Sequence, residues 1–152
     1  MLNGVCVLCR VSALRDIGLM DETFGGYVED ADWSSRALQK GWVSVFTPVS
    51  SVTHYEEEAG YEPYSLKTFM LKRNTVLWFL KTGRKRSARL YALASILLAG
   101  ARMMFGRSEA ERKKHKQFCI LLKRVYRGLL RGEVPREWFG PPVARWEGPH
   151  RA

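Results

Sequence analysis

Three carboxylates stand within four residues, at Glu29, Asp30 and Asp32, between a glycine pair and a segment with helical spacing. Acidic side chains in the first turn of a helix are stabilised by the positive end of its dipole, and this is their commonest role. Clustered carboxylate oxygens also suit a hard divalent cation. A single carboxylate held at such a place suits a general base. The residues by themselves favour the helix-start role and leave the other two open.

The elements that must position these carboxylates are short. Residues 5–11 are rich in Val, Leu and Cys, which is typical of a buried strand. Residues 42–46 alternate like a strand, and residues 51–55 have a similar composition. The acidic residues themselves begin a helix pattern over residues 29–40 that ends at Gly41. We therefore expect strands on both sides of the acidic helix.

The rest of the chain has helical periodicity. Apolar residues recur at helical spacing in three long segments, residues 65–81, 87–105 and 108–131. The longest uncharged run, residues 90–101, is shorter than the roughly 20 residues that span a bilayer, so we expect a buried or interfacial helix there. The tail, residues 134–152, is expected to be irregular.

Charge is distributed unevenly along the 152 residues. The net charge of +10 is the sum of −6 over residues 1–62, +15 over residues 63–133 and +1 over the tail. A surface of one sign attracts anionic lipid, nucleic acid or an acidic partner without distinguishing them. The 46% hydrophobic content and 26% charged content indicate a globular chain of one domain. Three cysteines, an odd number, argue against a disulfide framework and suit a reducing compartment.

The order of several motifs resembles the second half of family 2 glycosyltransferases, above all the bacterial rhamnosyltransferase-like members. The motifs are the segment 4–18, Asp21-Glu22, Phe24, Glu29-Asp30-Ala31-Asp32, Arg36, Gly41, Pro48 and His54. Leu19-Met20 departs from the family, which more often has Gly-Phe before Asp-Glu. The resemblance covers residues 4–55 well, and it extends weakly over residues 65–80 through Lys72-Arg73-Asn74.

The resemblance implies a fold class and a catalytic residue. The fold would be α/β, a partial GT-A (Rossmann-like) sandwich followed by a mainly α-helical basic segment. Asp30 would be the general base that takes the proton of the acceptor hydroxyl during inverting sugar transfer. Substrate-binding residues would be Tyr27, Glu29, Asp32, Trp33 and Arg36. Trp33 has an alternative role as a core residue.

The resemblance also implies a metal and a donor. His54 matches a position that in some members ligates the Mg²⁺ or Mn²⁺ ion of the donor diphosphate. A strand-end histidine bonded to a backbone carbonyl is the alternative. The nucleotide-binding half of the family has no counterpart in this sequence, and no Asp-x-Asp other than Asp30-Ala31-Asp32 occurs in it. We therefore expect a truncated chain, inactive alone, that needs a missing N-terminal half or a partner chain.

The expected organisation has three parts. Residues 1–62 would be the acceptor-side part of the glycosyltransferase, residues 63–133 basic amphipathic helices, and residues 134–152 the tail. The substrates would be a nucleotide-sugar donor and a glycan or lipid-linked acceptor in cell-surface polysaccharide synthesis. We expect the protein in the cytoplasm, peripheral at the inner face of an anionic membrane.

A rival hypothesis is a non-catalytic basic module that binds anionic membrane or nucleic acid through residues 65–131. Aromatic residues in this segment fall on apolar helix faces, where they cannot serve as stacking platforms for bases. Nucleic acid is therefore not an expected partner.

Overall fold

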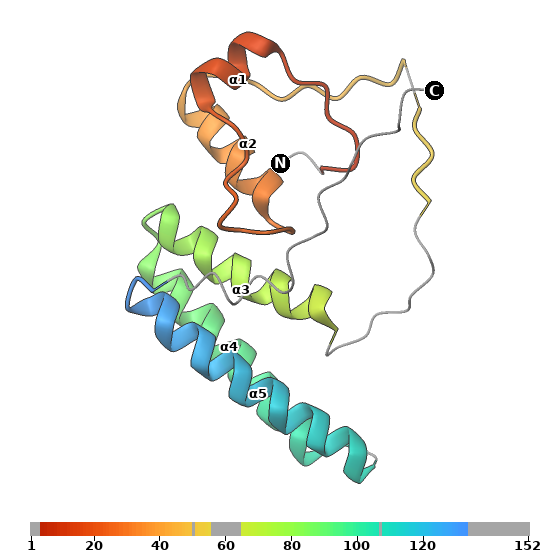
Figure 1. Ribbon diagram of the computed structural model, residues 1–152, viewed down its shortest axis with the longest axis vertical. Coiled ribbons are helices and arrows are strands. Elements are labelled where there is room, and N and C mark those ends of the chain that lie inside the picture. The colour runs from red at the N-terminus through yellow and green to blue at the C-terminus, as the bar shows by residue number, and fades with distance from the viewer. Residues whose placement is uncertain (1–3, 50, 56–64, 107, 134–152) are drawn as a thin grey trace, which may run out of the picture.

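The computed structural model describes residues 4–49, 51–55, 65–106 and 108–133. Five helices form within these residues (Figure 1): α1 (Val11–Ile17), α2 (Glu29–Gln39), α3 (Leu66–Lys81), α4 (Lys85–Met104) and α5 (Glu109–Leu130). The three long helices agree with the periodicity of the sequence to within a few residues at each end. The acidic residues Glu29, Asp30 and Asp32 lie in the first turn of α2, as the helix-start hypothesis predicted.

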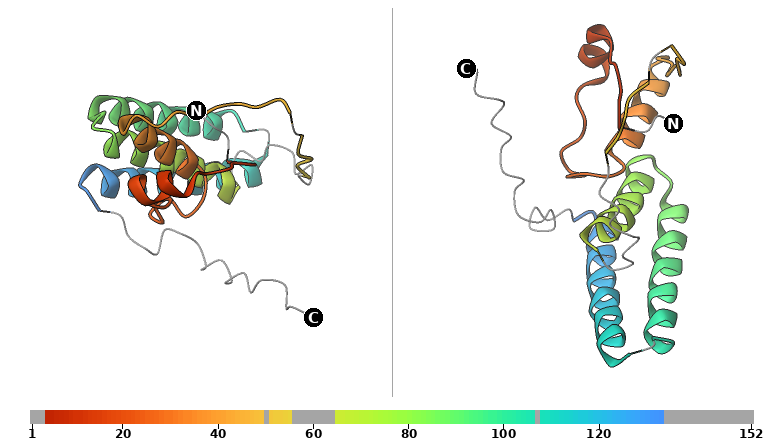
Figure 2. Two further views of the ribbon diagram at one scale, coloured as in Figure 1. Left: turned by 90° about the horizontal axis from the view of Figure 1, so that it is seen from above. Right: turned by 90° about the vertical axis from the view of Figure 1, so that its right-hand side faces the viewer.

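Helices α3, α4 and α5 pack together as a three-helix bundle (Figure 2). The Oγ of Ser65 accepts the backbone N–H of Thr68 at 3.2 Å, and the Oγ of Ser108 accepts that of Glu111 at 3.1 Å. These serines are N-caps, which satisfy backbone donors that a helix start otherwise leaves without a partner. Small residues line the buried face of α4, and they let neighbouring helices approach closely: Ala88, Ala92, Ser95 and Ala99.

The front of the chain forms a smaller unit from α1 and α2. Its core consists of Ala13, Ile17, Trp33 and Ala37. The loop between the two helices reaches the bundle, because Phe24 in this loop is fully buried among core residues of α3, α4 and α5. Phe24 therefore connects the acidic helix to the larger core.

The expectation of an α/β sandwich is wrong for this structure. The segments predicted as strands, residues 5–11, 42–46 and 51–55, form no strand, and no sheet occurs anywhere in the described residues. A strand becomes stable when a neighbouring strand accepts its backbone hydrogen bonds and another element covers one face. Val43, Val45 and Phe46 are 77–85% exposed, so no such cover is present and this segment runs irregularly.

Within the described residues, no helix is both long enough and apolar enough to cross a membrane. The tail expected to be irregular, residues 134–152, lies outside the described part of the chain.

Candidate active site

The loop that leads into the acidic helix has an unusual backbone. Four consecutive residues have positive φ angles: Gly25 (65°), Gly26 (129°), Tyr27 (64°) and Val28 (74°). Glycine adopts this region freely, but the left-handed conformation costs other residues roughly 1–2 kcal/mol. A β-branched residue such as Val28 is a clear outlier there. Other contacts must hold this loop in place.

Those contacts come from Asn74, in the middle of α3. Its Nδ2 donates to the carbonyl oxygens of Phe24 at 2.9 Å, Gly26 at 2.5 Å and Tyr27 at 2.7 Å. An amide carries two protons, so the three carbonyls share them. The side chain is fully buried, which excludes water as a competing partner. Asn74 therefore fixes the strained loop immediately before the acidic residues.

Arg73 reinforces this contact from the neighbouring position. Its Nη1 donates to the carbonyl of Phe24 at 3.2 Å and also to the Oδ1 of Asn74, and its Nη2 donates to the carbonyl of Thr23 at 3.0 Å. Burial of the guanidinium lowers the pKa of Arg73 to about 10, so the group remains charged at neutral pH. We call Arg73 and Asn74 the α3 clamp.

A second link between the loop and α3 is an ion pair of Asp21 with Lys81. The Oδ1 of Asp21 also accepts the backbone N–H of Thr23 at 2.9 Å and its hydroxyl at 2.6 Å. Partial burial would raise the pKa of Asp21, but the hydrogen bonds from Lys81 and Thr23 outweigh it and lower the pKa to about 2. The loop is therefore tied to α3 near its start by charge and near its end by the α3 clamp.

Asp30, the predicted general base, is partly exposed in the first turn of α2. Its Oδ2 accepts the backbone N–H of Gly4 at 2.8 Å, and its Oδ1 accepts the backbone N–H of Ala31 at 2.7 Å. These bonds orient the carboxylate. Each oxygen has further lone-pair capacity for a hydroxyl donor. The geometry is compatible with a proton acceptor.

Three predicted substrate-binding residues have partners within the chain. The Nε of Arg36 lies 2.8 Å from the Oδ2 of Asp32, which is 4% exposed. The two terminal nitrogens of Arg36 donate to the carbonyls of Ile17 and Leu19, both at 2.9 Å. Trp33 is buried in the α1–α2 core, in accord with the alternative for this residue, and its Nε1 donates to the carbonyl of Gly18 at 2.8 Å. The contacts of Trp33 and Arg36 join α2 to the end of α1, and Asp32 pairs with Arg36 within α2.

The other two predicted substrate-binding residues lie beside Asp30 in sequence and are more accessible. The Tyr27 side chain is 42% exposed, and the Nζ of Lys67 lies 5.9 Å from the centre of its ring. Glu29 is partly buried, and its Oε2 has no hydrogen-bond partner among the described residues. Tyr27 and Asp30 are therefore accessible to a substrate at this end of α2, whereas the unpartnered oxygen of Glu29 is buried.

The structure does not bring His54 into a metal cluster. His54 is exposed, in a segment without regular structure. Among the residues that the structure describes, no group of three or more His, Cys, Asp or Glu side chains is arranged to hold a metal ion. The residues present therefore do not fit a metal centre by themselves.

The α3 clamp is a functional feature that the sequence motifs indicate only weakly. Arg73 and Asn74 entered the prediction only through a weak resemblance, although a signal was present. A charged residue and an amide stand together in a helix whose neighbours at Met70, Val76 and Leu77 are buried and apolar. Polar groups at buried positions need hydrogen-bond partners, so such a pair indicates a contact with backbone from elsewhere.

Comparison with known proteins gives a partial relationship to glycosyltransferases. The chain is 38% identical over 65 residues to N-acetylglucosaminyl-diphospho-decaprenol L-rhamnosyltransferase of Mycobacterium tuberculosis, in two strains. The match covers 42% of this chain and 21% of each relative, so it spans about a fifth of the length of those proteins. No protein-family model and no solved structure matches the chain.

Proposed function

We propose that this chain is the acceptor-side part of a family 2 glycosyltransferase that moves a sugar from a nucleotide-sugar donor to a glycan or lipid-linked acceptor with inversion. The observation that carries the proposal is the position of Asp30, oriented by Gly4 and Ala31 at a partly exposed helix start. The partial match to a rhamnosyltransferase supports it. Cell-surface polysaccharide synthesis is the process in which such an acceptor would be used.

The chemistry needs one proton transfer to Asp30. The acceptor hydroxyl attacks the anomeric carbon of the donor while its proton passes to a carboxylate oxygen of Asp30. The bond between the anomeric carbon and the donor diphosphate breaks, and the nucleoside diphosphate leaves with the bonding electrons. Attack from the face opposite the leaving group inverts the anomeric centre. A positioned general base typically accelerates such a step by ~10²–10⁴-fold.

The remaining predicted site residues form two groups: those that would contact the acceptor, and those whose contacts within the chain hold α2 in position. Tyr27, three residues before Asp30 and exposed, is placed to bind the acceptor, and Glu29, next to Asp30 and partly buried, would help to orient the acceptor or the base. Trp33 and Arg36 hold α2 against α1 and Asp32 pairs with Arg36, so these three residues would influence the substrate through the position of this helix. The α3 clamp does the same for the loop before Asp30.

Binding of the nucleotide-sugar donor requires a metal ion and a donor-binding segment in addition to the residues around Asp30. In the complete enzyme, Mg²⁺ or Mn²⁺ would neutralise charge on the donor diphosphate, with His54 as the ligand expected from this chain. Among the described residues, no group of three or more His, Cys, Asp or Glu side chains is arranged to hold this ion, so its other ligands would come from the donor-binding side. A donor-binding segment or partner chain is part of the proposal.

The decisive test is sugar transfer by protein purified from its own host, so that any donor-binding chain accompanies it. Transfer of labelled sugar from uridine or thymidine diphosphate donors to lipid extracts is measured for wild type and Asp30→Asn. We expect the variant to lose ~10²-fold or more of the rate with an unchanged circular dichroism spectrum. Glu22→Gln, which removes an exposed acid without an assigned role in the site, is the matched control and should keep the rate. Full activity of Asp30→Asn would overturn the assignment.

Gly4→Ala tests the orientation of the base separately. A Cβ at this position would lie 3.3 Å from the Cβ of Asp30 and 3.4 Å from its Oδ2, closer than is usual. The carboxylate must shift to make room. We expect a lower kcat with little change in KM, because the base is displaced while the acceptor site remains.

A second candidate function is binding to an anionic membrane without catalysis, through residues 65–131. The observation that favours it is the excess of cations on α3, α4 and α5, which carry fifteen Lys or Arg residues and two Glu. In either case, the proposal places the protein in the cytoplasm, peripheral at the inner face of the cell membrane. Nucleic acid is disfavoured because Phe69, Phe118 and Tyr126 are buried, and the exposed Phe105 by itself does not make a row of stacking platforms.

A further inference from the structure

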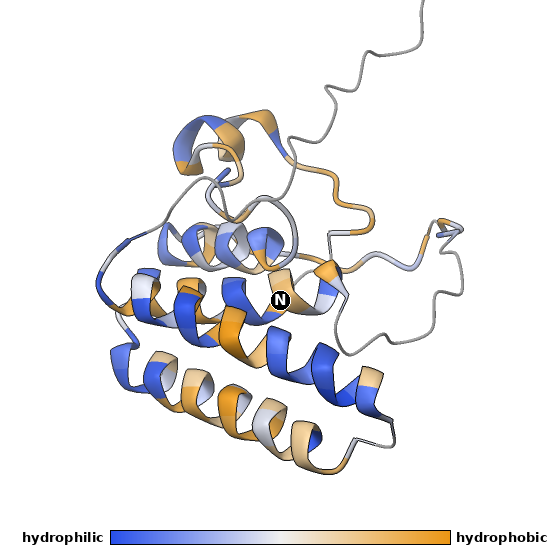
Figure 3. Ribbon diagram, turned by 60° about the horizontal axis from the view of Figure 1, so that its bottom comes forward, coloured by the Kyte–Doolittle hydropathy of each residue, from blue (hydrophilic) through white to orange (hydrophobic). Residues whose placement is uncertain are grey.

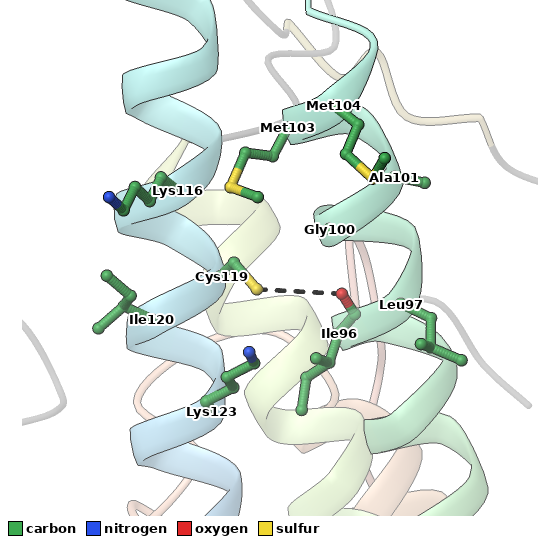
Figure 4. A pocket seen from close by; sticks show the side chains of 10 residues that line it. All are labelled: Ile96, Leu97, Gly100, Ala101, Met103, Met104, Lys116, Cys119, Ile120 and Lys123. Carbon is green, nitrogen blue, oxygen red and sulfur yellow. Dashed lines mark hydrogen bonds between the residues drawn. The ribbon is translucent and has the colours of Figure 1, made fainter.

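An apolar groove of about 570 Å³ runs between α4 and α5 (Figure 4). The α4 side of the groove is formed largely by Leu97, Ala101 and Met104, and the α5 side by Ile120, Lys116 and Lys123. At the base of the groove, the Sγ of Cys119 lies 4.0 Å from the carbonyl oxygen of Ile96. The groove is therefore apolar along its floor and has lysines along one rim.

The apolar surface continues from the groove over the outside of α4. Leu90, Leu93, Leu97 and Met104 recur at helical spacing and are 54–73% exposed. Figure 3 shows that α4 is apolar over most of its length. No charged residue occurs between Leu90 and Ala101. We call Leu90, Leu93, Leu97, Met104, Lys116 and Lys123 the α4–α5 face.

Cations surround this apolar surface. α4 and α5 together carry eleven Lys or Arg residues and two Glu, both of which are in the first turn of α5. Lys85, Arg86 and Arg89 stand at the start of α4, and Arg102 stands near its end. A helix with an apolar stripe bordered by Lys and Arg is typical of segments that lie in the interface of a membrane.

We propose that the α4–α5 face docks on an anionic phospholipid bilayer. The leucines of α4 enter the boundary between headgroups and acyl chains, and the lysines of the groove contact headgroup phosphates. This inference deepens the membrane location in the proposed function, but it requires neither donor nor acceptor, so its test is independent of sugar transfer.

Charge complementarity favours the bilayer over a second copy of the chain. The α4–α5 face carries Lys116 and Lys123 and no acidic residue, so two such faces brought together would place only like charges in one interface. Like charges brought together oppose association. An anionic bilayer supplies the opposite charge and an apolar phase at the same surface, and each basic residue near it raises binding roughly fivefold.

The experiment is sedimentation of the full chain with vesicles of phosphatidylglycerol, compared with phosphatidylcholine, at low and high salt. We expect binding to phosphatidylglycerol vesicles that weakens as salt rises. The double variant Leu93→Asp, Leu97→Asp should bind at least about tenfold less tightly. Leu38→Asp is the matched control, because Leu38 is an exposed leucine of α2 with a similar exposed fraction, 69%.

A charge variant keeps the test informative if the leucine variant misfolds. Lys123→Glu, on the groove, should weaken binding by more than the control Lys114→Glu, because Lys114 does not line the groove. Circular dichroism checks the fold of each variant. Equal binding by Lys123→Glu and Lys114→Glu, or equal binding to both vesicle types, would overturn the proposal. A dimer without vesicles that the leucine variant dissociates would assign the face to a second copy instead.

Discussion

The side-chain amide of Asn74 donates to the carbonyl oxygen of Tyr27, 47 residues earlier in the chain, at 2.7 Å. This bond joins the middle of α3 to Tyr27, one of the residues with positive φ in the loop that leads into α2. It connects the larger core to the proposed base, Asp30, through three residues of backbone.

Removing this amide should destabilise the protein. Asn74→Ala deprives the carbonyls of Phe24, Gly26 and Tyr27 of a buried donor, and a buried group left without its partner costs about 1–3 kcal/mol. We expect the free energy of unfolding in urea to fall by ~2–4 kcal/mol. Thr75→Ala is the control, since its hydroxyl bonds only to a carbonyl one turn earlier in α3. Similar losses for the two variants would contradict the role of the α3 clamp.

Relief of backbone strain should be measurable at Tyr27. Its φ of 64° suits glycine, whereas alanine keeps the penalty of the left-handed region. We therefore expect Tyr27→Gly to be more stable than Tyr27→Ala by roughly 1 kcal/mol, although both lose the same ring. Thermal unfolding of the pair measures the difference. If Tyr27→Ala is the more stable variant, the positive φ is not a feature of the folded protein.

Loss of Arg36 should leave a buried carboxylate without its counterion. Arg36→Ala removes the partner of Asp32 and two donors to the end of α1. Breaking a buried pair in this way costs roughly 3–5 kcal/mol. Lys40→Ala is the comparison, because Lys40 pairs with Asp16 at the exposed surface, where such pairs contribute about 0–1 kcal/mol. Equal effects in urea denaturation would show that Asp32 is hydrated.

Acid should weaken the link between Asp21 and Lys81. The pKa of Asp21 is about 2 in the folded protein and 3.8 without its partners, so the folded state favours the ionised form. The stabilisation is therefore complete above about pH 5 and is lost as the pH falls from about 4 to 2. We expect Asp21→Asn to cost about 1 kcal/mol at pH 7, after allowance for solvent screening.

The measurement for Asp21 is the unfolding free energy of wild type and variant as a function of pH. The difference between them should shrink as the pH falls through this range, and salt should reduce it at neutral pH. Glu22→Gln, which removes the neighbouring exposed acid, is the control. A difference that does not change with pH would rule out the ion pair as its source.

The long helices were predictable because a helix forms its backbone hydrogen bonds within a single segment. Apolar spacing located α3, α4 and α5 to within a few residues at each end. The same reasoning placed Glu29, Asp30 and Asp32 at the start of α2, where the helix dipole favours acids.

The strand predictions were wrong because a strand, unlike a helix, depends on hydrogen bonds with another segment. The alternation at residues 42–46 indicates a preference, but a strand needs a second segment to receive its hydrogen bonds, and Val43, Val45 and Phe46 remain exposed. A local pattern cannot supply that partner. The described part of the chain is consequently helical, and the expected α/β sandwich is absent from it.

The sequence by itself determined the charge division of the chain, its long helices and the acidic start of α2. The tertiary structure alone decided how Asp30 is presented, through Gly4, the left-handed run from Gly25 to Val28 and the α3 clamp. The physical reason is distance along the chain. Helix propensity and dipole effects act within a few residues, whereas the contact of Gly4 with Asp30 and those of the α3 clamp with the loop before it join segments 26 to 50 residues apart.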